Sequence, residues 1–312
     1  MSSQNHVLWQ ERFRPKTVKQ IILPAKVKKF VNNIIESKVL PNLILYYPKP
    51  GNGKTSLARA ICNDLGITNV LHINASLSAN IDLLRTDITD FASVWSIDGG
   101  IKVVILEEMD NASLAFQNAL KDFSETYSDV CRFIMTTNNI SKIIPPLKSR
   151  FELIEYGMED KKVRDDLVPK IKSWLCAILK KDKINFSEQS VHQLVEKCYP
   201  DIRFMFKSLQ CEFIENGEIT ENVIQLVSVD RDLYEMILTK KLTDARRYLI
   251  EKQISYGDMY TKLYTEFIPL IENKSQQAGA IVIIAESMDD HTRSINQEIT
   301  FVSCMIQLMN IL

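Results

Sequence analysis

A short glycine-containing loop carries the residues whose types and spacing best suit chemistry. An apolar run at 42–47 (NLILYY) leads into the loop at 48–56 (PKPGNGKTS), and a helical pattern (LARAICNDL) follows it. A strand, a tight loop with Gly-Lys-Thr and a helix form the setting of a phosphate-binding loop. Backbone N–H groups of such a loop and the N-terminus of its helix face phosphate oxygens, because both carry partial positive charge.

Two side chains of this loop match the needs of a bound triphosphate. We expect the Lys54 ammonium to neutralise the β- and γ-phosphates, and the Thr55 hydroxyl to bind Mg²⁺. The usual pattern begins with glycine, where this chain has Pro48. The alternative interpretation is a chance match in a turn, which the flanking patterns disfavour. The predicted nucleotide-binding residues of the loop are Gly51, Asn52, Gly53, Lys54, Thr55 and Ser56.

Two adjacent carboxylates follow another apolar run. The sequence KVVIL at 102–106 continues into Glu107 and Glu108, so a buried strand delivers both at its C-terminal end. Side chains alternate along a strand, which places the two on opposite faces and suits two tasks. We predict that Glu107 holds Mg²⁺ and that Glu108 orients and deprotonates the attacking water. The usual first residue is Asp, and the alternative is a solvated acidic turn.

Three more polar side chains lie at the ends of predicted elements. Asn138 follows the strand-like run at 131–136, where its amide can hydrogen-bond the γ-phosphate or the attacking water. Arg150 precedes a last strand-like run, and Arg203 lies in the first turn of a helix that Asp201 is expected to cap. From the residues alone, an Asn-rich turn and two surface arginines remain the simpler interpretation.

The elements that must position these residues alternate in the first half of the chain. A helical apolar face recurs over 113–127, and alternating strands and helices predict an α/β domain with a parallel sheet at 1–157. Helical patterns alone follow, with expected breaks at Gly217 and Gly257, and predict two all-helical domains at 158–227 and 228–312. The strand-like runs lie at 42–47, 70–74, 102–106, 131–136 and 151–156.

Composition limits the class of protein. The chain has 312 residues, of which 46% are hydrophobic and 25% charged, as in ordinary globular proteins. Its net charge of −1 means that any nucleic-acid contact must come from a local patch. The cysteines have no CxxC spacing, which disfavours zinc and predicts free thiols in a reducing cytoplasm. No apolar run approaches the roughly 20 residues of a membrane span, so no membrane partner is expected.

Together the motifs resemble the AAA+ clamp-loader ATPases, namely replication factor C small subunits and, more closely, the clamp-loader large subunit of tailed bacteriophages. The resemblance is strongest over 8–157 and 199–209. It implies an α/β phosphate-loop AAA+ domain, then an all-α lid and an all-α C-terminal collar that joins subunits. It also implies ATP and Mg²⁺ as cofactors, and other loader subunits, a sliding clamp and primer–template DNA as partners.

The resemblance also implies the roles of individual residues. It matches Asn138 to a first sensor, Arg203 to a second sensor, and Arg150 to an arginine finger that reaches the nucleotide of a neighbouring subunit. It matches Asn74 to a switch that couples DNA binding to the catalytic carboxylate. The N-terminal segment (LWQERFRPKTVKQII) resembles the family's adenine-pocket segment and implies nucleotide contacts from Gln10, Glu11, Arg12, Phe13 and Ile22.

Contacts with DNA and the clamp are implied at three further places. Arg85 matches a basic position that faces DNA inside the ring, and Lys121 belongs to a helix that resembles an interface helix and is a candidate DNA contact. The apolar loop 91–97 (FASVWSI) is either a clamp contact or part of the core.

We therefore predict a DNA-stimulated and clamp-stimulated ATPase subunit of a clamp loader, acting in DNA replication. The expected assembly is a pentamer of identical copies and a different small subunit, in the host bacterial cytoplasm if the chain is viral. Two alternatives remain open: a nucleotide-binding scaffold without hydrolysis, and a helicase loader or remodelling motor.

Overall fold

The computed structural model divides the chain into two compact units, Met1–Val223 and Ile224–Leu312. It describes residues 8–75, 84–93, 100–223, 233–252, 256–271, 273–294 and 296–312. The two units are described separately below. Within the described ranges, no helix is both long enough and apolar enough to cross a membrane.

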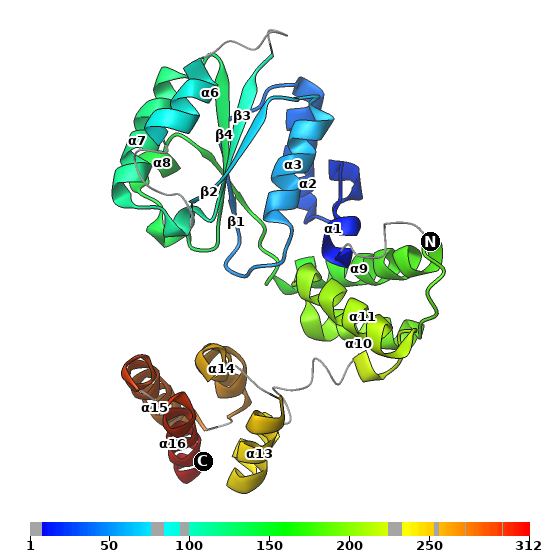
Figure 1. Cartoon of the computed structure of the whole chain (residues 1–312), viewed down its shortest axis with the longest axis vertical. Coiled ribbons are helices and arrows are strands. Elements are labelled where there is room, and N and C mark those ends of the chain that lie inside the picture. The colour runs from blue at the N-terminus through cyan, green and yellow to red at the C-terminus, as the bar shows by residue number, and fades with distance from the viewer. Residues whose placement is uncertain are drawn as a thin grey trace. The chain divides into compact units, whose positions relative to one another are not determined.

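A parallel sheet with five strands forms the centre of the first unit (Figure 1), in the order β2-β3-β4-β1-β5. The buried strands are apolar because helices cover both faces, with α2 and α3 on one side and α6, α7 and α8 on the other. The predicted α/β class and the five predicted strands are confirmed. The strands are β1 (Leu43–Tyr46), β2 (Val70–Asn74), β3 (Lys102–Glu107), β4 (Cys131–Thr137) and β5 (Glu152–Glu155).

The helices that cover the sheet follow the predicted periodicity. In α7, Phe116 and Leu120 are buried against the sheet, and the Ser113 hydroxyl caps the helix by accepting from the Phe116 N–H at 3.2 Å. This confirms the helix predicted over 113–127. The helices are α1 (Trp9–Arg12), α2 (Ala25–Ser37), α3 (Lys54–Asp64), α6 (Thr89–Ser93), α7 (Leu114–Thr126) and α8 (Pro145–Lys148).

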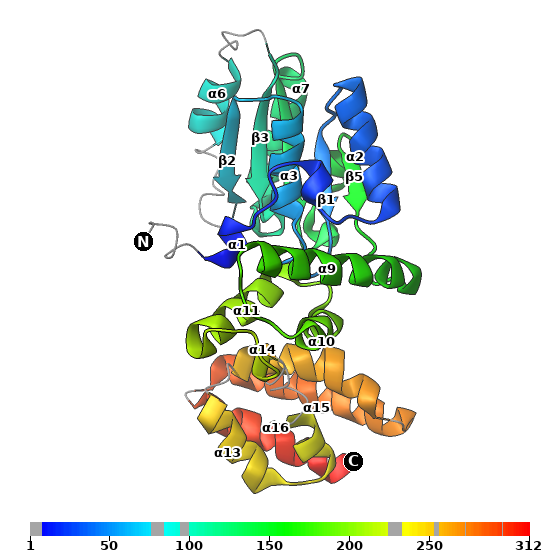
Figure 2. The ribbon, with the colours of Figure 1, turned by 90° about the vertical axis from the view of Figure 1, so that its right-hand side faces the viewer.

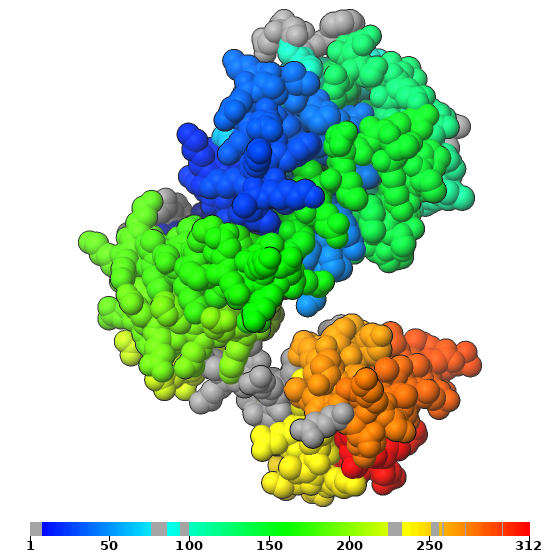
Figure 3. Space-filling view, turned by 180° about the vertical axis from the view of Figure 1, so that it is seen from behind, coloured from blue at the N-terminus to red at the C-terminus, as the bar shows by residue number. Residues whose placement is uncertain are grey.

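Three helices, called the lid helices below, complete the first unit. They are α9 (Lys161–Lys181), α10 (Glu188–Cys198) and α11 (Ile202–Asn216). The carboxyl ends of the strands point towards α1 and α9 (Figure 2). The N-terminal segment lies directly against the lid helices (Figure 3), where the Trp9 N–H donates to Gln210 Oε1 at 2.9 Å. Asp201 caps α11 and Gly217, with φ +74°, ends it, as predicted.

The described residues of the second unit form helices joined by short turns. Its core packs Tyr260, Phe267 and Phe301 between the helices. The break predicted at Tyr256-Gly257 falls at a helix boundary, because one long helix ends at Lys252 and the next, α14, begins at Tyr256. The longer helices are α13 (Leu242–Lys252), α14 (Tyr256–Lys262), α15 (Lys274–Arg293) and α16 (Gln297–Ile311).

Candidate functional site

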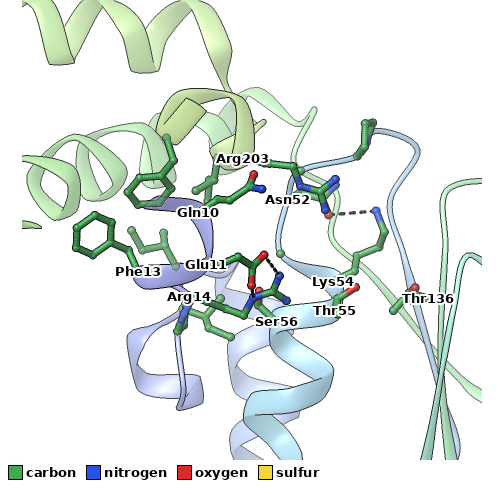
Figure 4. A pocket seen from close by; sticks show the side chains of 18 of the residues that line it. Gln10, Glu11, Phe13, Arg14, Asn52, Lys54, Thr55, Ser56, Thr136 and Arg203 are labelled. Atoms are coloured by element: carbon green, nitrogen blue, oxygen red, sulfur yellow. Dashed lines mark hydrogen bonds and ion pairs between the residues drawn. The ribbon is translucent and has the colours of Figure 1, made fainter. Parts of the chain in front are cut away.

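A pocket in the first unit opens where β1, β3 and β4 end and α1 and α11 approach them (Figure 4). These three strands are neighbours and parallel, so their carboxyl ends meet at one edge of the sheet. Most of the predicted nucleotide-binding residues line this pocket. They are Gln10, Glu11, Phe13, Ile22, Gly51, Asn52, Gly53, Lys54, Thr55, Ser56 and Arg203.

The loop between β1 and α3 has the backbone that glycine permits. Gly51 and Gly53 have φ values of +78° and +83°, in the left-handed region. Gly53 is the N-cap of α3, and Lys54 opens the helix. The loop therefore ends at a helix N-terminus that faces the pocket, which is the arrangement that binds phosphate.

Lys54 is buried at the floor of the pocket, with 8% of its surface exposed. Its ammonium donates to the carbonyls of Tyr47 at 3.3 Å and Lys49 at 3.1 Å, and to Asn52 Oδ1 at 3.2 Å (Figure 4). Burial lowers the pKa of Lys54 to about 8, against the attraction of Asp110. These three acceptors are uncharged, so a phosphate bound in this pocket would give the buried Lys54 ammonium an anionic partner.

Two oxygen-bearing side chains meet beside the loop. The Thr55 hydroxyl donates to Glu107 Oε2 at 3.1 Å, so the longer side chain at position 107 reaches the place where an aspartate is usual. Hydroxyl and carboxylate oxygens are the ligands that Mg²⁺ prefers, so the pair fits this ion. Arg59 lies 3.4 Å from Glu107 Oε1 and competes for the same carboxylate.

Glu108 leaves β3 with strained backbone. Its φ of +57° lies in the left-handed region, which costs a residue with a side chain about 1–2 kcal/mol. Its N–H donates to the Thr136 hydroxyl of the neighbouring strand at 3.3 Å, and its exposed side chain lines the pocket. Strain of this kind is often found where a side chain must point at a reacting group.

Asn138 directly follows β4 and lines the same pocket as Glu108. Its N–H donates to Asp110 Oδ1 at 3.1 Å, and the Thr137 hydroxyl donates to the same oxygen at 3.1 Å. Its side-chain oxygen is buried and finds no hydrogen-bond partner among the described residues. Buried polar atoms are usually paired, so this amide is available to a ligand.

Aromatic rings from the N-terminal segment and the lid helices form the other end of the pocket. Phe13 stacks on Phe206 with centroids 5.5 Å apart, and Trp174 meets Phe206 edge-on at 5.4 Å. Sequence reasoning missed Phe206 and Trp174. Phe206 lies one helical turn after Arg203, so helical spacing was a signal for it. Trp174 had no comparable signal, because its distance from the loop in sequence is large.

The structure places other predicted residues outside the pocket lining. Arg12 pairs with Asp182 at 2.6 Å, so its predicted nucleotide contact stays a prediction. Arg150 is exposed on the turn after α8, where it pairs with Glu125 and donates to the Pro146 carbonyl at 3.1 Å. It is not among the described residues that line the pocket.

The predicted switch and DNA contacts lie on other elements. Asn74 ends β2 in register with Glu107. Lys121 lies on α7 and pairs with Asp122 at 2.8 Å. The Arg85 side chain lies outside what the structure describes, although its backbone falls in the π-helical turn Leu84–Ile88. Of the apolar loop 91–97, residues 91–93 belong to α6 and the rest lie outside the described residues.

Gly51 makes a close contact that gives a stability prediction. A Cβ built on Gly51 would lie 1.8 Å from Asp201 Oδ1, whereas one on Gly53 would meet nothing within 4 Å. We expect Gly51→Ala to lower the free energy of unfolding of the first unit by about 2 kcal/mol. About 1 kcal/mol comes from left-handed strain, and about 1 more comes from turning Asp201 away from its cap.

Gly53→Ala is the matched control for Gly51→Ala, with an expected loss of about 1 kcal/mol from strain alone. Denaturant unfolding followed by tryptophan fluorescence measures both losses, because Trp9, Trp95 and Trp174 all belong to the first unit. Equal losses for the two variants would contradict the close contact.

Comparisons with known proteins agree with the fold. A family model described as the ATPase family associated with various cellular activities (AAA) matches residues 44–157. The sliding-clamp-loader large subunit of Enterobacteria phage T4 is 30% identical, over 99% of this chain and 97% of that protein. The replication factor C small subunit of Methanococcus maripaludis is 31% identical, over 89% of this chain and 90% of that protein.

Among solved structures, the RuvB Holliday junction branch migration motor of Thermotoga maritima has a similar fold. The TM-score is 0.57 at 18% identity, and the match covers 78% of this chain and 86% of the RuvB chain. At this identity the likeness concerns the fold alone.

Proposed function

Because this chain belongs to the AAA family of sliding-clamp-loader and replication factor C subunits, we propose that it is the ATPase subunit of a DNA sliding-clamp loader. In this proposal, ATP binding and hydrolysis open the clamp and load it onto primer–template DNA during replication. One observation carries the proposal. The loop at 48–56, the ends of β3 and β4, and α11 converge on one pocket, while Arg150 lies on an exposed turn elsewhere.

The pocket residues divide the work of phosphoryl transfer. Backbone N–H groups of the loop and the Lys54 ammonium hold the triphosphate, and catalysis consists largely of positioning and charge neutralisation. Thr55 and Glu107 would hold Mg²⁺. That ion, when bound, supplies further charge neutralisation at the phosphates. Phe13 and Phe206 receive the base.

The remaining groups act on the bond that breaks. Glu108 accepts a proton from the attacking water, and the Asn138 amide orients that water or the γ-phosphate. Arg203 reaches from the lid helices towards Asn52 of the loop (Figure 4), where it would meet the phosphates. Arg150 completes the site of a neighbouring subunit, so hydrolysis depends on assembly. In this proposal Asn74 couples DNA binding to the catalytic carboxylate of Glu108. Arg85 and Lys121 face the DNA.

The proposed assembly is a pentamer in the cytoplasm, with identical copies of this chain and a different small subunit. Residues 1–157 form the ATPase domain and 158–227 the lid domain. Residues 228–312 form a collar that joins the subunits, a role suited to their amphipathic helices. In the proposed ring, the exposed Arg150 of one subunit lies beside the nucleotide pocket of the next subunit.

Co-purification of the loader with clamp and primer–template DNA tests this function. We expect recovery of a loader–clamp–DNA complex only with a non-hydrolysable ATP analogue, because bound triphosphate organises the ring that grips the clamp. Steady-state ATP hydrolysis by the same loader should rise when clamp and DNA are both present.

A Lys54→Ala loader is the control, since it lacks the buried cation for the triphosphate and should give no analogue-dependent complex. Equal recovery of the complex without nucleotide would contradict the mechanism. Nucleotide binding without DNA-stimulated hydrolysis would favour a scaffold instead.

A further inference from the structure

The first turn of α11 rests on the phosphate loop through a backbone contact. The Gly51 carbonyl accepts hydrogen bonds from the N–H groups of Ile202 at 3.1 Å and Arg203 at 3.3 Å. The first N–H groups of a helix have no partner inside the helix, so here the loop supplies one. The next N–H, that of Phe204, donates to the Asp201 carboxylate at 2.9 Å.

Asp201, the N-cap of α11, also packs against Gly51. Its carboxylate is so close to the Cα of Gly51 that any side chain at position 51 would collide with it, since a Cβ would lie 1.8 Å from Oδ1. Lys54 of the loop also attracts this carboxylate, as does Arg203 of α11 itself. Loop and helix are therefore joined by hydrogen bonds, close packing and the attraction between Lys54 and Asp201. We call this contact the Gly51–α11 junction.

The same helix also holds the aromatic end of the pocket. Phe206 of α11 stacks on Phe13, with ring centroids 5.5 Å apart. One turn further on, Gln210 Oε1 accepts from the Trp9 N–H at 2.9 Å. An α-helix is rigid over this length, with a rise of about 1.5 Å per residue. A displacement of the first turn of α11 would therefore also move the N-terminal segment, through the contacts of Phe206 and Gln210.

We propose that the Gly51–α11 junction is a latch that keeps the lid helices closed over bound nucleotide and so sets the rate at which nucleotide leaves. Asp201 and the Ile202 amide are its positioning groups. While the junction holds, Arg203 and Phe206 face the pocket. When it breaks, α11 moves away and takes the N-terminal segment with it, because Trp9 is bonded to Gln210. This inference rests on the nucleotide site proposed above.

A pair of substitutions at Ile202 tests the amide that joins α11 to the loop. Ile202→Pro removes the N–H that is shared between the Gly51 carbonyl at 3.1 Å and the Pro200 carbonyl at 3.1 Å, and proline is well suited to the first position of a helix. The preceding Asp201, with φ −80° and ψ 88°, is already outside the helical region, as a residue before proline must be. Ile202→Ala also removes most of the side chain but keeps the N–H, so it is the matched control.

Stopped-flow release of a fluorescent ADP analogue from the full chain measures the latch. We expect Ile202→Pro to release it about fivefold faster than Ile202→Ala, the equivalent of about 1 kcal/mol for one hydrogen bond. Thermal unfolding of the two variants should be similar. Equal release rates would overturn the latch. A wild-type chain that binds no fluorescent ADP would overturn the nucleotide site itself, and the latch with it.

A second pair keeps the test independent of proline. Asp201→Ala and Asp160→Ala each remove an aspartate cap. Asp160 accepts from the Lys162 N–H at 2.8 Å at the start of α9, whereas the side-chain atoms nearest a Cβ on Gly51 all belong to Asp201. Both variants should lose similar thermal stability, but only Asp201→Ala should speed nucleotide release. Asp201→Asn keeps an oxygen acceptor for the Phe204 N–H and should release nucleotide as slowly as the unchanged chain. Equal acceleration by Asp160→Ala would show a general weakening of the lid helices and overturn the latch.

Discussion

Replacing Arg150 with lysine should lower ATP turnover by the assembled loader at least about 10³-fold, with nucleotide binding by the separate subunit unchanged. Arg150 is exposed and is not among the described residues that line the pocket of its own chain. In the proposed ring, its effect would come from contact with a neighbour's nucleotide. Lysine keeps the charge but loses the planar fork that binds two phosphate oxygens at once.

Arg164→Lys is the matched control for Arg150→Lys. Arg164 is an exposed arginine on α9 that pairs with Glu196 at 3.2 Å, as Arg150 pairs with Glu125. Steady-state phosphate release by the full assembly, with clamp and primer–template DNA, measures both variants. Full turnover by an Arg150→Lys assembly would remove the arginine finger from the mechanism.

Glu108→Gln should slow hydrolysis by about 10²- to 10⁴-fold, the usual contribution of a general base, and leave ATP binding intact. Glutamine has the same shape but cannot accept the proton of the attacking water. Its backbone can keep the left-handed φ of +57° and the N–H bond to Thr136. The variant loader should therefore hold clamp and DNA with ATP itself, which single-turnover hydrolysis and co-purification both measure.

Glu107→Gln separates the two carboxylates. Because Glu107 contacts the Thr55 hydroxyl, its loss should raise the Mg²⁺ concentration needed for half-maximal hydrolysis. Glu108→Gln should leave that concentration unchanged. Rapid hydrolysis by Glu108→Gln would assign the base to another residue. A higher Mg²⁺ concentration for half-maximal hydrolysis in Glu108→Gln, but not in Glu107→Gln, would exchange the roles proposed for the two carboxylates.

Local pattern was sufficient to predict the sheet and the phosphate loop. Strands β1, β3 and β4 are apolar runs because both faces of a parallel sheet are covered. Their carboxyl ends share one edge, so the loop, Glu107 and Asn138 come together by topology alone. The caps of α7 and α11 also follow from neighbouring residues.

The contacts that pattern did not predict join segments far apart in sequence. Helical periodicity shows which face of α9 or α11 is apolar, but not what that face meets. Trp174 therefore gave no sign of lining the pocket, and Arg12 gave no sign of pairing with Asp182.

The edge strand β5 affects whether the sheets of two copies of this chain can pair with one another. Only four residues long, it carries exposed carboxylates at both ends, Glu152 and Glu155. A short edge strand with charged side chains pairs poorly with a strand of another chain. If two copies of β5 did pair, their carboxylates would face one another and repel. In the proposed ring, where identical copies would be neighbours, this edge would therefore disfavour sheet-to-sheet aggregation of the subunits.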